Sequence, residues 1–173
     1  MLLKLSGAVL VLAAAVLGGL YYGSFETYRS NDLQEMKKAL AILKAEILFS
    51  MTPLPEAFLN IASRTRNPVA DLFRRFSVCL KDNRREPIED IWQSCLKAHA
   101  GKTYLNREDL AAFLSFGRTL GYLDRDMQEA GIAVTIGYID TAVASLAQTR
   151  AKNQKMFASL GMFAGLITVI ILL

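Results

Sequence analysis

Two long runs without a charged residue, one near each end, constrain the fold of this chain more than any other feature. The first run covers residues 5–22 (LSGAVLVLAAAVLGGLYY) and the second covers residues 156–173 (MFASLGMFAGLITVIILL). Each run reaches the short end of the roughly 17–25 residues that a helix needs to cross a bilayer. All 16 acidic residues lie between the runs, as does every basic residue except Lys4. We therefore expect a transmembrane helix at residues 1–24, a charged domain at residues 25–155 and a second transmembrane helix at residues 156–173.

The first run has an alternative interpretation. A positive charge at Lys4, followed by an apolar stretch with small residues at Ala13, Ala14 and Ala15, is also typical of a secretory signal peptide. The run stays apolar past these alanines to Tyr22, which favours a retained anchor. The alternative is an exported helical binding module whose N-terminal signal peptide is cleaved.

The placement of basic residues predicts on which side of the membrane the charged domain lies. Arg150, Lys152 and Lys155 precede the second run, and no charge follows it. Basic residues next to a span favour the cytoplasm. We therefore expect a cytoplasmic domain, in which Cys79 and Cys95 are reduced thiols.

The charged domain shows helical periodicity throughout. Apolar residues spaced by three and four predict a helix over residues 31–51. Further helices are expected to begin at Pro55, Pro68 and Pro87, after an N-cap at Asn106, and after an N-cap at Asp124. Gly121 can close the fifth helix, and the sixth can continue unbroken into the second run. The expected fold class is therefore all-α: a cytoplasmic bundle of about six helices flanked by an N-terminal and a C-terminal transmembrane helix.

Short loops make successive helices antiparallel, so the turns of the bundle alternate between two ends. One end is expected to lie at the membrane, and we call it the proximal end. Its basic residues face anionic lipid in this interpretation, at about 1 kcal/mol for each well-placed side chain. The equally favoured alternative is that they are ordinary solvated loop charges. The proximal basic set consists of Arg29, Arg64, Arg66, Lys102, Arg150, Lys152 and Lys155.

The other end, which we call the distal end, contains an unusual pair of prolines in the sequence EILFSMTPLPEAF. Leu54 precedes a proline and is expected to avoid helical angles, whereas Pro55 suits the first helical position. This corner is the best candidate for a partner contact, and the equally favoured alternative is that the two prolines only stop one helix and start the next. The candidate partner-binding residues are Thr52, Pro53, Leu54, Pro55, Glu56, Arg84, Arg85 and Asp126.

The two apolar runs each contain glycines spaced by four. Gly19 and Gly23 lie at the end of the first run, and Gly161 and Gly165 lie in the second. Such pairs let membrane helices approach closely. We expect the spans to pack against each other or a partner, although a lipid-exposed helix is an equal alternative.

Catalytic patterns are scarce. The sequence Gly101-Lys102-Thr103 lacks the earlier glycine of a phosphate-binding loop, and His99 is expected to end a helix. The paired acids Glu89–Asp90 and Glu108–Asp109 fall in first turns, where the helix dipole favours acids. We expect no enzymatic activity, no cofactor, no metal site and no nucleic-acid binding.

Several segments together resemble the stage III sporulation protein AB family. They are KLSGAVLVLAAAVLGG, EILFSMTPLPEAF, NPVADLFRRF, LGYLDRDMQ and KMFASLGMFAGLITVIILL, so the resemblance runs from end to end. The sharpest motif is TPLPEA at residues 52–57.

The resemblance implies a function that the spacing of residues does not. It implies a non-enzymatic structural subunit of the secretion-like channel between mother cell and forespore, required for endospore formation. The protein would sit in the mother-cell membrane around the forespore, with its soluble domain in the cytoplasm. The helical domain is similar to those of type II secretion and type IV pilus platform proteins, which dock a motor ATPase.

The implied partners are other channel subunits and the stage III sporulation protein AA ATPase. Platform proteins usually carry two such domains, whereas this chain has one. A platform role would therefore need a homo-oligomer or another subunit.

Overall fold

The computed structural model describes residues 25–50, 52–82, 85–121 and 124–172, except for the side chains of residues 154–155 and 157–172. All regular secondary structure in these residues is helical, which confirms the all-α prediction there. Gly19 and Gly23 lie outside the described residues, as do Arg84 and the whole first apolar run.

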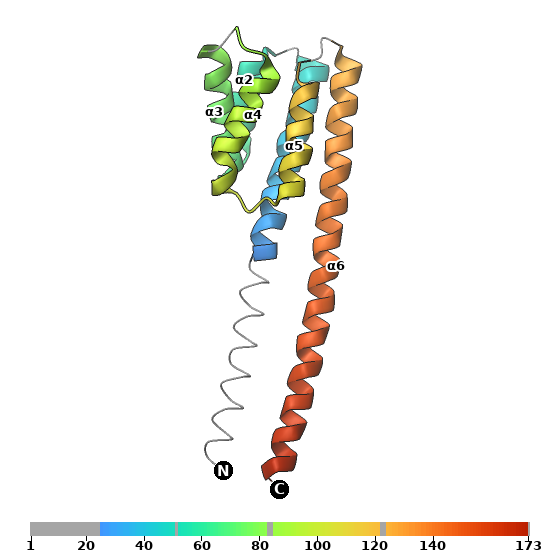
Figure 1. Cartoon of the computed structure of the whole chain (residues 1–173). Coiled ribbons are helices and arrows are strands. Elements are labelled where there is room, and N and C mark those ends of the chain that lie inside the picture. Colours follow the sequence, from blue (N-terminus) through green and yellow to red (C-terminus); the bar gives the residue numbers. More distant parts are fainter. Residues whose placement is uncertain (1–24, 51, 83–84, 122–123, 173) are drawn as a thin grey trace. The chain divides into compact units, whose positions relative to one another are not determined.

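The helices follow one another through short turns (Figure 1). A first helix covers residues 25–45 and passes into a π-helical turn, η1. The remaining elements are α2, α3, α4, a short 3₁₀ helix η2, α5 and α6. Their bounds are η1 Glu46–Ser50, α2 Leu54–Arg64, α3 Val69–Asp82, α4 Ile88–His99, η2 Ala100–Lys102, α5 Arg107–Thr119 and α6 Arg125–Leu172. Residues Tyr28–Val143 form one compact unit, which we call the bundle.

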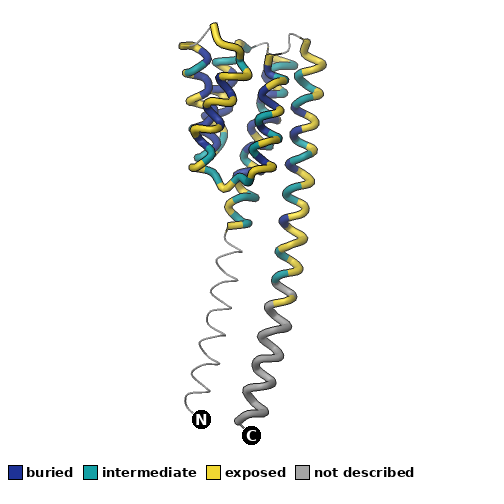
Figure 2. The backbone as a smooth tube through the Cα atoms, in the orientation of Figure 1, coloured by how far each residue is buried: buried dark blue, intermediate teal, exposed yellow. Residues whose placement is uncertain are grey.

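The bundle core is built around Trp92 of α4. Its ring lies 5.0–5.7 Å from the rings of Phe73, Phe76 and Phe116, measured between centroids. The indole Nε1–H donates to the carbonyl of Phe113 at 2.7 Å, so the buried polar edge of the ring is satisfied. Figure 2 shows buried residues lining the inner faces of α2, α3, α4 and α5. This aromatic cluster joins α3, α4 and α5 in a single core.

Gly117 of α5 allows its helix to approach Trp92 closely. A Cβ atom at this position would lie 2.2 Å from Trp92 Cδ1, well inside van der Waals contact. The glycine is therefore explained by packing, at the usual cost in helix propensity of about 1 kcal/mol relative to alanine.

Two helix ends differ from the sequence predictions. The sequence predicts the first helix over residues 31–51. In the structure this helix is already formed at Phe25, and its α-helical geometry ends at Ala45. The α5 helix ends at Thr119 with Leu120 as its C-cap, and none of the described glycines has a positive φ. Gly121 therefore does not close α5 through a left-handed conformation.

The proline corner also differs from its prediction. Pro53 is the N-cap of α2, Leu54 is its first residue and Pro55 its second, so Leu54 does adopt a helical conformation. The N–H groups of Glu56 and Ala57 donate to the carbonyl of Pro53 at 2.9 and 3.0 Å and start the helix. A proline at the second position loses no hydrogen bond, because first-turn N–H groups have no partner inside the helix.

Other predicted helix starts match more closely. Pro87 is the N-cap of α4, one residue before the position predicted for it. Asn106 caps α5 through a reciprocal pair of hydrogen bonds with Asp109, and Asp124 accepts the N–H of Asp126 at 2.9 Å. Both predicted N-caps are confirmed.

Within the bundle, the turns alternate between two ends as antiparallel connection requires. Figure 1 shows the turns before α2, α4 and α6 at one end. The turns before α3 and α5 lie at the opposite end, where the first helix begins. These are the distal and proximal ends, respectively, of the sequence prediction.

A membrane-crossing length is present in α6. Within the described side chains, Arg125–Asn153 is long and apolar enough to cross a membrane, with mean hydropathy 1.5 and 22% of its most apolar stretch buried. The predicted second span is helical up to Leu172, and Gly161 and Gly165 lie on this helix.

Candidate functional site

The proximal end is held together by a buried carboxylate at Asp109, whose side chain is 0% exposed. Arg29 of the first helix donates to it twice, from Nε to Oδ2 at 2.8 Å and from a terminal nitrogen to Oδ1 at 2.9 Å. The Tyr138 hydroxyl of α6 donates to Oδ1 at 2.8 Å, and the Asn106 N–H donates to Oδ2 at 2.9 Å. We call these four residues the Asp109 node.

The Asp109 node keeps its central carboxylate ionised. Burial alone would raise the pKa of Asp109, but the hydrogen bonds from Arg29, the Asn106 backbone and Tyr138 outweigh it and lower the pKa. Both oxygens of the buried carboxylate already accept hydrogen bonds from groups of the same chain, including two from Arg29. The node therefore ties the first helix, α5 and α6 together at one point.

The Asp109 node corrects two sequence interpretations. Arg29 was predicted to face lipid, but its side chain is only 17% exposed and its guanidinium is paired with Asp109. From the sequence, the helix dipole alone explains the acidic residue at position 109. In the structure, Asp109 accepts hydrogen bonds from the first helix, from the start of α5 and from α6. The capping pattern pointed to Asp109 as a helix-start residue, but no local signal could indicate a partner 80 positions away.

The loop that leads into α5 is attached to the first helix beside the node. Asp32 is buried and accepts the N–H of Tyr104 at 2.8 Å, and the Tyr28 and Tyr104 rings stack at 4.8 Å. Burial raises the pKa of Asp32, with the Tyr104 hydrogen bond acting against the rise. His99 ends α4 as predicted, and its ring nitrogen lies 2.9 Å from the carbonyl of Pro68.

The other predicted lipid-facing residues are distributed over both units of the chain. Arg64, Arg66 and Lys102 are exposed at the proximal turns of the bundle. Arg150 is half-buried and Lys152 is exposed, and both lie outside the bundle, which ends at Val143. The side chain of Lys155 lies outside the described ones. Three basic side chains of the predicted set therefore remain available on the bundle itself.

At the distal end, the π-helical turn is fixed by Glu46. This buried carboxylate accepts from the Thr52 hydroxyl at 2.7 Å and from Asn60 Nδ2 at 3.2 Å. On the other side of the corner, the Ser77 hydroxyl donates to the carbonyl of Pro55 at 2.6 Å. We call residues 46–56 the distal corner. Thr52, predicted to contact a partner, uses its hydroxyl to hold this corner in shape.

The distal corner exposes a large aromatic residue that the sequence reasoning missed. Phe49 lies in η1 with 83% of its surface exposed. Pro53 and Glu56 are also exposed, whereas Leu54 and Pro55 are partly covered. The spacing of three and four that runs through Leu43 and Ile47 leaves Phe49 off the apolar face, but the contacts predicted from the sequence do not include this residue.

Two further predicted partner residues, Arg85 and Asp126, are exposed in the other distal turns. Figure 1 places these turns at the same end of the bundle as the distal corner. The structure therefore brings the described part of the predicted surface to one end.

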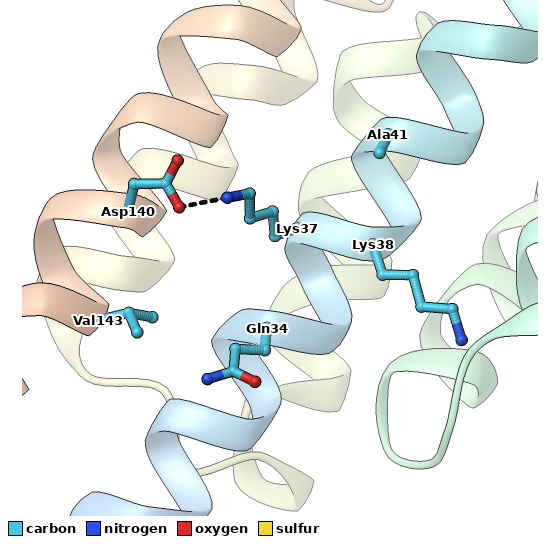
Figure 3. Close-up of a pocket in the computed structure, with 6 residues that line it drawn as sticks. All are labelled: Gln34, Lys37, Lys38, Ala41, Asp140 and Val143. Carbon is cyan, nitrogen blue, oxygen red and sulfur yellow. Dashed lines mark hydrogen bonds and ion pairs between the residues drawn. The ribbon is translucent and has the colours of Figure 1, made fainter. Parts of the chain in front are cut away.

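A groove of about 470 Å³ lies between the first helix and α6, lined by Gln34, Lys37, Lys38, Ala41, Asp140 and Val143. Lys37 reaches Asp140 at 2.5 Å, while Lys38 points away (Figure 3). A second ion pair, Lys44–Glu129 at 2.8 Å, joins the same two helices. The pair between Lys37 and Asp140 is therefore an internal contact between these two helices.

The described residues contain no group of three or more side chains suited to hold a metal ion. Cys79 and Cys95 are free thiols. Burial, together with a hydrogen bond to Cys79, raises the pKa of Cys95 to about 12. A thiol with so high a pKa is a poor nucleophile, because the thiolate is the reactive form.

The comparisons with known proteins agree with each other. A family model described as stage III sporulation protein AB matches residues 4–173. A protein named stage III sporulation protein AB from Bacillus subtilis (strain 168) is 33% identical over 172 residues, which cover 99% of this chain and 100% of that protein. A solved structure of stage III sporulation protein AB (SpoIIIAB) matches with a TM-score of 0.67 and 29% identity, covering 72% of this chain and 98% of that one.

Proposed function

Because the chain belongs to the stage III sporulation protein AB family, we propose that it is a membrane-anchored assembly subunit of the channel between mother cell and forespore. The supporting observation is the Asp109 node, which joins the beginning of the first helix to α6 at one end of the bundle. Both segments that lead to the predicted spans are thereby tied together, and the opposite end is left for a partner.

The proposed role is non-enzymatic. The best candidate for an acid–base residue, Asp109, is fully buried and paired with Arg29. Its lowered pKa also makes it a weak base. Both properties suit a structural residue better than a catalytic one.

The proposed partner of the distal end is the stage III sporulation protein AA ATPase. Phe49 and Leu54 supply apolar contact area, and Glu56, Arg85 and Asp126 supply charges of both signs around it. A central aromatic anchor with a charged rim is the usual composition of a protein-binding surface. Arg84 belongs to the proposed surface on the basis of its sequence position.

The proposed location is the mother-cell membrane around the forespore, with the bundle in the cytoplasm. The exposed Arg64, Arg66 and Lys102 then face the lipid headgroups. An anionic surface attracts such residues by about 1 kcal/mol each.

The test is photo-crosslinking in sporulating cells. A photoreactive amino acid replaces Phe49, and a control replaces Ser115, which is exposed on α5 between the two ends. We expect the Phe49 variant to capture the ATPase and the Ser115 variant not to capture it. Equal capture at both positions, or none at Phe49, contradicts the docking proposal.

The intact mass of the mature chain tests the anchor separately. A full-length mass supports the retained first span. A chain that lacks residues 1 to about 15 supports the exported alternative instead.

A further inference from the structure

The outward face of α6 carries no charge over a long distance. Met127, Ala130, Val134, Gly137 and Thr141 follow spacings of three and four and are all exposed, Val134 at 74% and Met127 at 50%. They cover about 21 Å of helix at 1.5 Å per residue. We call these five residues the α6 stripe. Exposed faces of soluble helices are normally charged or polar, so an uncharged face of this length needs a reason.

The acidic residues next to the stripe are directed away from it. Between residues 127 and 149 the chain contains only two charged residues, Glu129 and Asp140. Both pair with lysines of the first helix, Lys44 and Lys37. The Thr141 hydroxyl donates to the Gly137 carbonyl of its own helix, so its proton needs no hydrogen-bond acceptor on a partner. The stripe is therefore a neutral surface bordered by charges that are already neutralised.

Gly137 is not explained by packing against the residues that the structure describes. A Cβ atom at Gly117 would meet Trp92 and one at Gly131 would meet Thr119, both closer than 3 Å. A Cβ atom at Gly137 would meet no atom of the described part of the chain within 4 Å, although a glycine inside a helix is unfavourable relative to alanine. A glycine on a neutral helix face allows the backbone of a second helix to approach closely.

We propose that the α6 stripe is the contact by which two copies of this chain pair, with their α6 helices parallel. Spacings of three and four are those of the core positions in a two-stranded helical pair. A neutral stripe needs a neutral partner of the same length, and the stripe of a second copy meets both conditions. The parallel direction rests on the proposed membrane anchoring, because two copies anchored in one membrane point the same way.

The test uses the full chain reconstituted in lipid vesicles, with Cys79→Ser and Cys95→Ala removing the native thiols. Val134→Cys, Gly137→Cys and Thr141→Cys are oxidised one at a time with copper phenanthroline, and Ser115→Cys is the exposed control. A parallel two-fold pair places each stripe position opposite itself. We therefore expect disulfide-linked dimers at the three stripe positions and none at Ser115.

Three results would overturn the proposal. The first is equal crosslinking at the stripe and at Ser115, or none at the stripe. The second is crosslinking in a mixture of Val134→Cys and Thr141→Cys chains with none in either chain alone, which indicates an antiparallel pair. The third is the capture of a different protein through the stripe in sporulating cells, in place of a second copy. Retention of the chain in membranes after an alkaline wash is measured in parallel, so that failed pairing is not confused with failed anchoring.

Gly137→Ala separates pairing from folding. Alanine favours the helix, and its Cβ would meet no described atom within 4 Å, so we expect the variant to have a raised Tm. The added methyl group also holds the two helices apart, so we expect Val134→Cys crosslinking to fall in the same variant. A raised Tm with unchanged crosslinking would contradict the close approach at Gly137.

Discussion

Asp109 shows how a single buried residue can decide the arrangement of one end of the bundle. Its side chain carries a negative charge and has no exposed surface. This buried charge is stabilised by hydrogen-bond donors from the first helix, α5 and α6. Removal of Arg29 would leave this charge buried and only partly compensated. Breaking a buried ion pair in this way usually costs about 3–5 kcal/mol.

We therefore predict that Arg29→Met lowers the free energy of unfolding by about 3–5 kcal/mol. The matched control is Arg66→Met, whose exposed side chain should change stability by no more than about 0.5 kcal/mol. Trp92 is the only tryptophan and lies in the core, so its fluorescence reports denaturant unfolding. Equal losses in the two variants would show that the Asp109 node contributes nothing specific.

The pH dependence of this loss is a second prediction. The pKa of Asp109 is lowered in the folded protein, so its stabilising contribution is present above its ordinary pKa and is lost as the pH falls through the lowered value. Without Arg29, burial raises the pKa, and the variant gains stability as its carboxyl group becomes protonated. The difference between wild type and Arg29→Met should therefore shrink between pH 7 and about pH 4. A difference that stays constant over this range would contradict the charge-based explanation.

Gly117 and Gly137 form a matched pair for a third prediction. Gly117→Ala places a Cβ atom 2.2 Å from Trp92 Cδ1. Overpacking of this kind costs about 1–3 kcal/mol, of which the better helix propensity of alanine returns up to about 1 kcal/mol. We expect Gly117→Ala to lower Tm and Gly137→Ala to raise it. A Tm that Gly117→Ala leaves unchanged or raises would be inconsistent with the close packing of α5 on Trp92.

At the scale of elements, the distal corner is organised by Glu46. The π-helical turn is a local departure from the α-helix, and such turns occur often at functional positions. The carboxylate of Glu46 connects this turn to Thr52 and to Asn60 of α2. The exposure of Phe49 is thus coupled to a contact that a single substitution can remove.

We predict that Glu46→Ala loosens the distal corner while the proximal end stays intact. The variant loses two hydrogen bonds to a charged acceptor, one from Thr52 and one from Asn60, so we expect a cost of about 1–3 kcal/mol. Hydrogen exchange should accelerate in residues 46–56 and remain unchanged in residues 103–109. The same variant should also reduce ATPase capture at Phe49. Faster exchange at both ends alike would indicate general destabilisation instead of a local effect.

The elements also show what the sequence could and could not predict. The helices, their order and the N-caps at Asn106 and Asp124 follow from local patterns of apolar spacing and capping, which act within a few residues. The π-helical turn and the partner of Arg29 depend on contacts with segments farther along the chain, at Asn60 and Asp109. Local patterns contain no information on such contacts. The predicted start of α2 at Pro55 was wrong by one residue. The helix begins at Leu54, because the usual preference of a residue before proline yields to the hydrogen bonds that Pro53 accepts.

At the scale of the whole molecule, the two ends of the bundle differ in character. The proximal end combines the Asp109 node with the exposed basic residues Arg64, Arg66 and Lys102. The distal end combines an exposed aromatic residue with charges of both signs. This difference matches the proposed arrangement, in which one end meets lipid and the other meets a protein.

The proposed orientation gives a final prediction for the full chain in vesicles. A fluorophore at Ser63→Cys, next to Arg64, should be quenched more strongly by nitroxide-headgroup lipid than one at Glu86→Cys in a distal turn. Both sites are exposed, and the 11 residues of α2 alone place the two ends about 16 Å apart. Native thiols are removed as above.

Lipid charge then distinguishes electrostatic contact from mere proximity. Each basic residue near an anionic surface contributes about 1 kcal/mol, so Arg64→Glu with Arg66→Glu should remove at least about 2 kcal/mol of attraction. With Arg64 and Arg66 present, we expect quenching at Ser63→Cys to rise with the fraction of anionic lipid. With both arginines changed to glutamate, we expect quenching to be independent of that fraction. High salt should have the same effect as the reversal, because exposed charges are screened over about 8–10 Å at physiological ionic strength and over less at higher salt. Quenching at Ser63→Cys that is unaffected by anionic lipid, salt and charge reversal would identify these arginines as ordinary solvated loop residues.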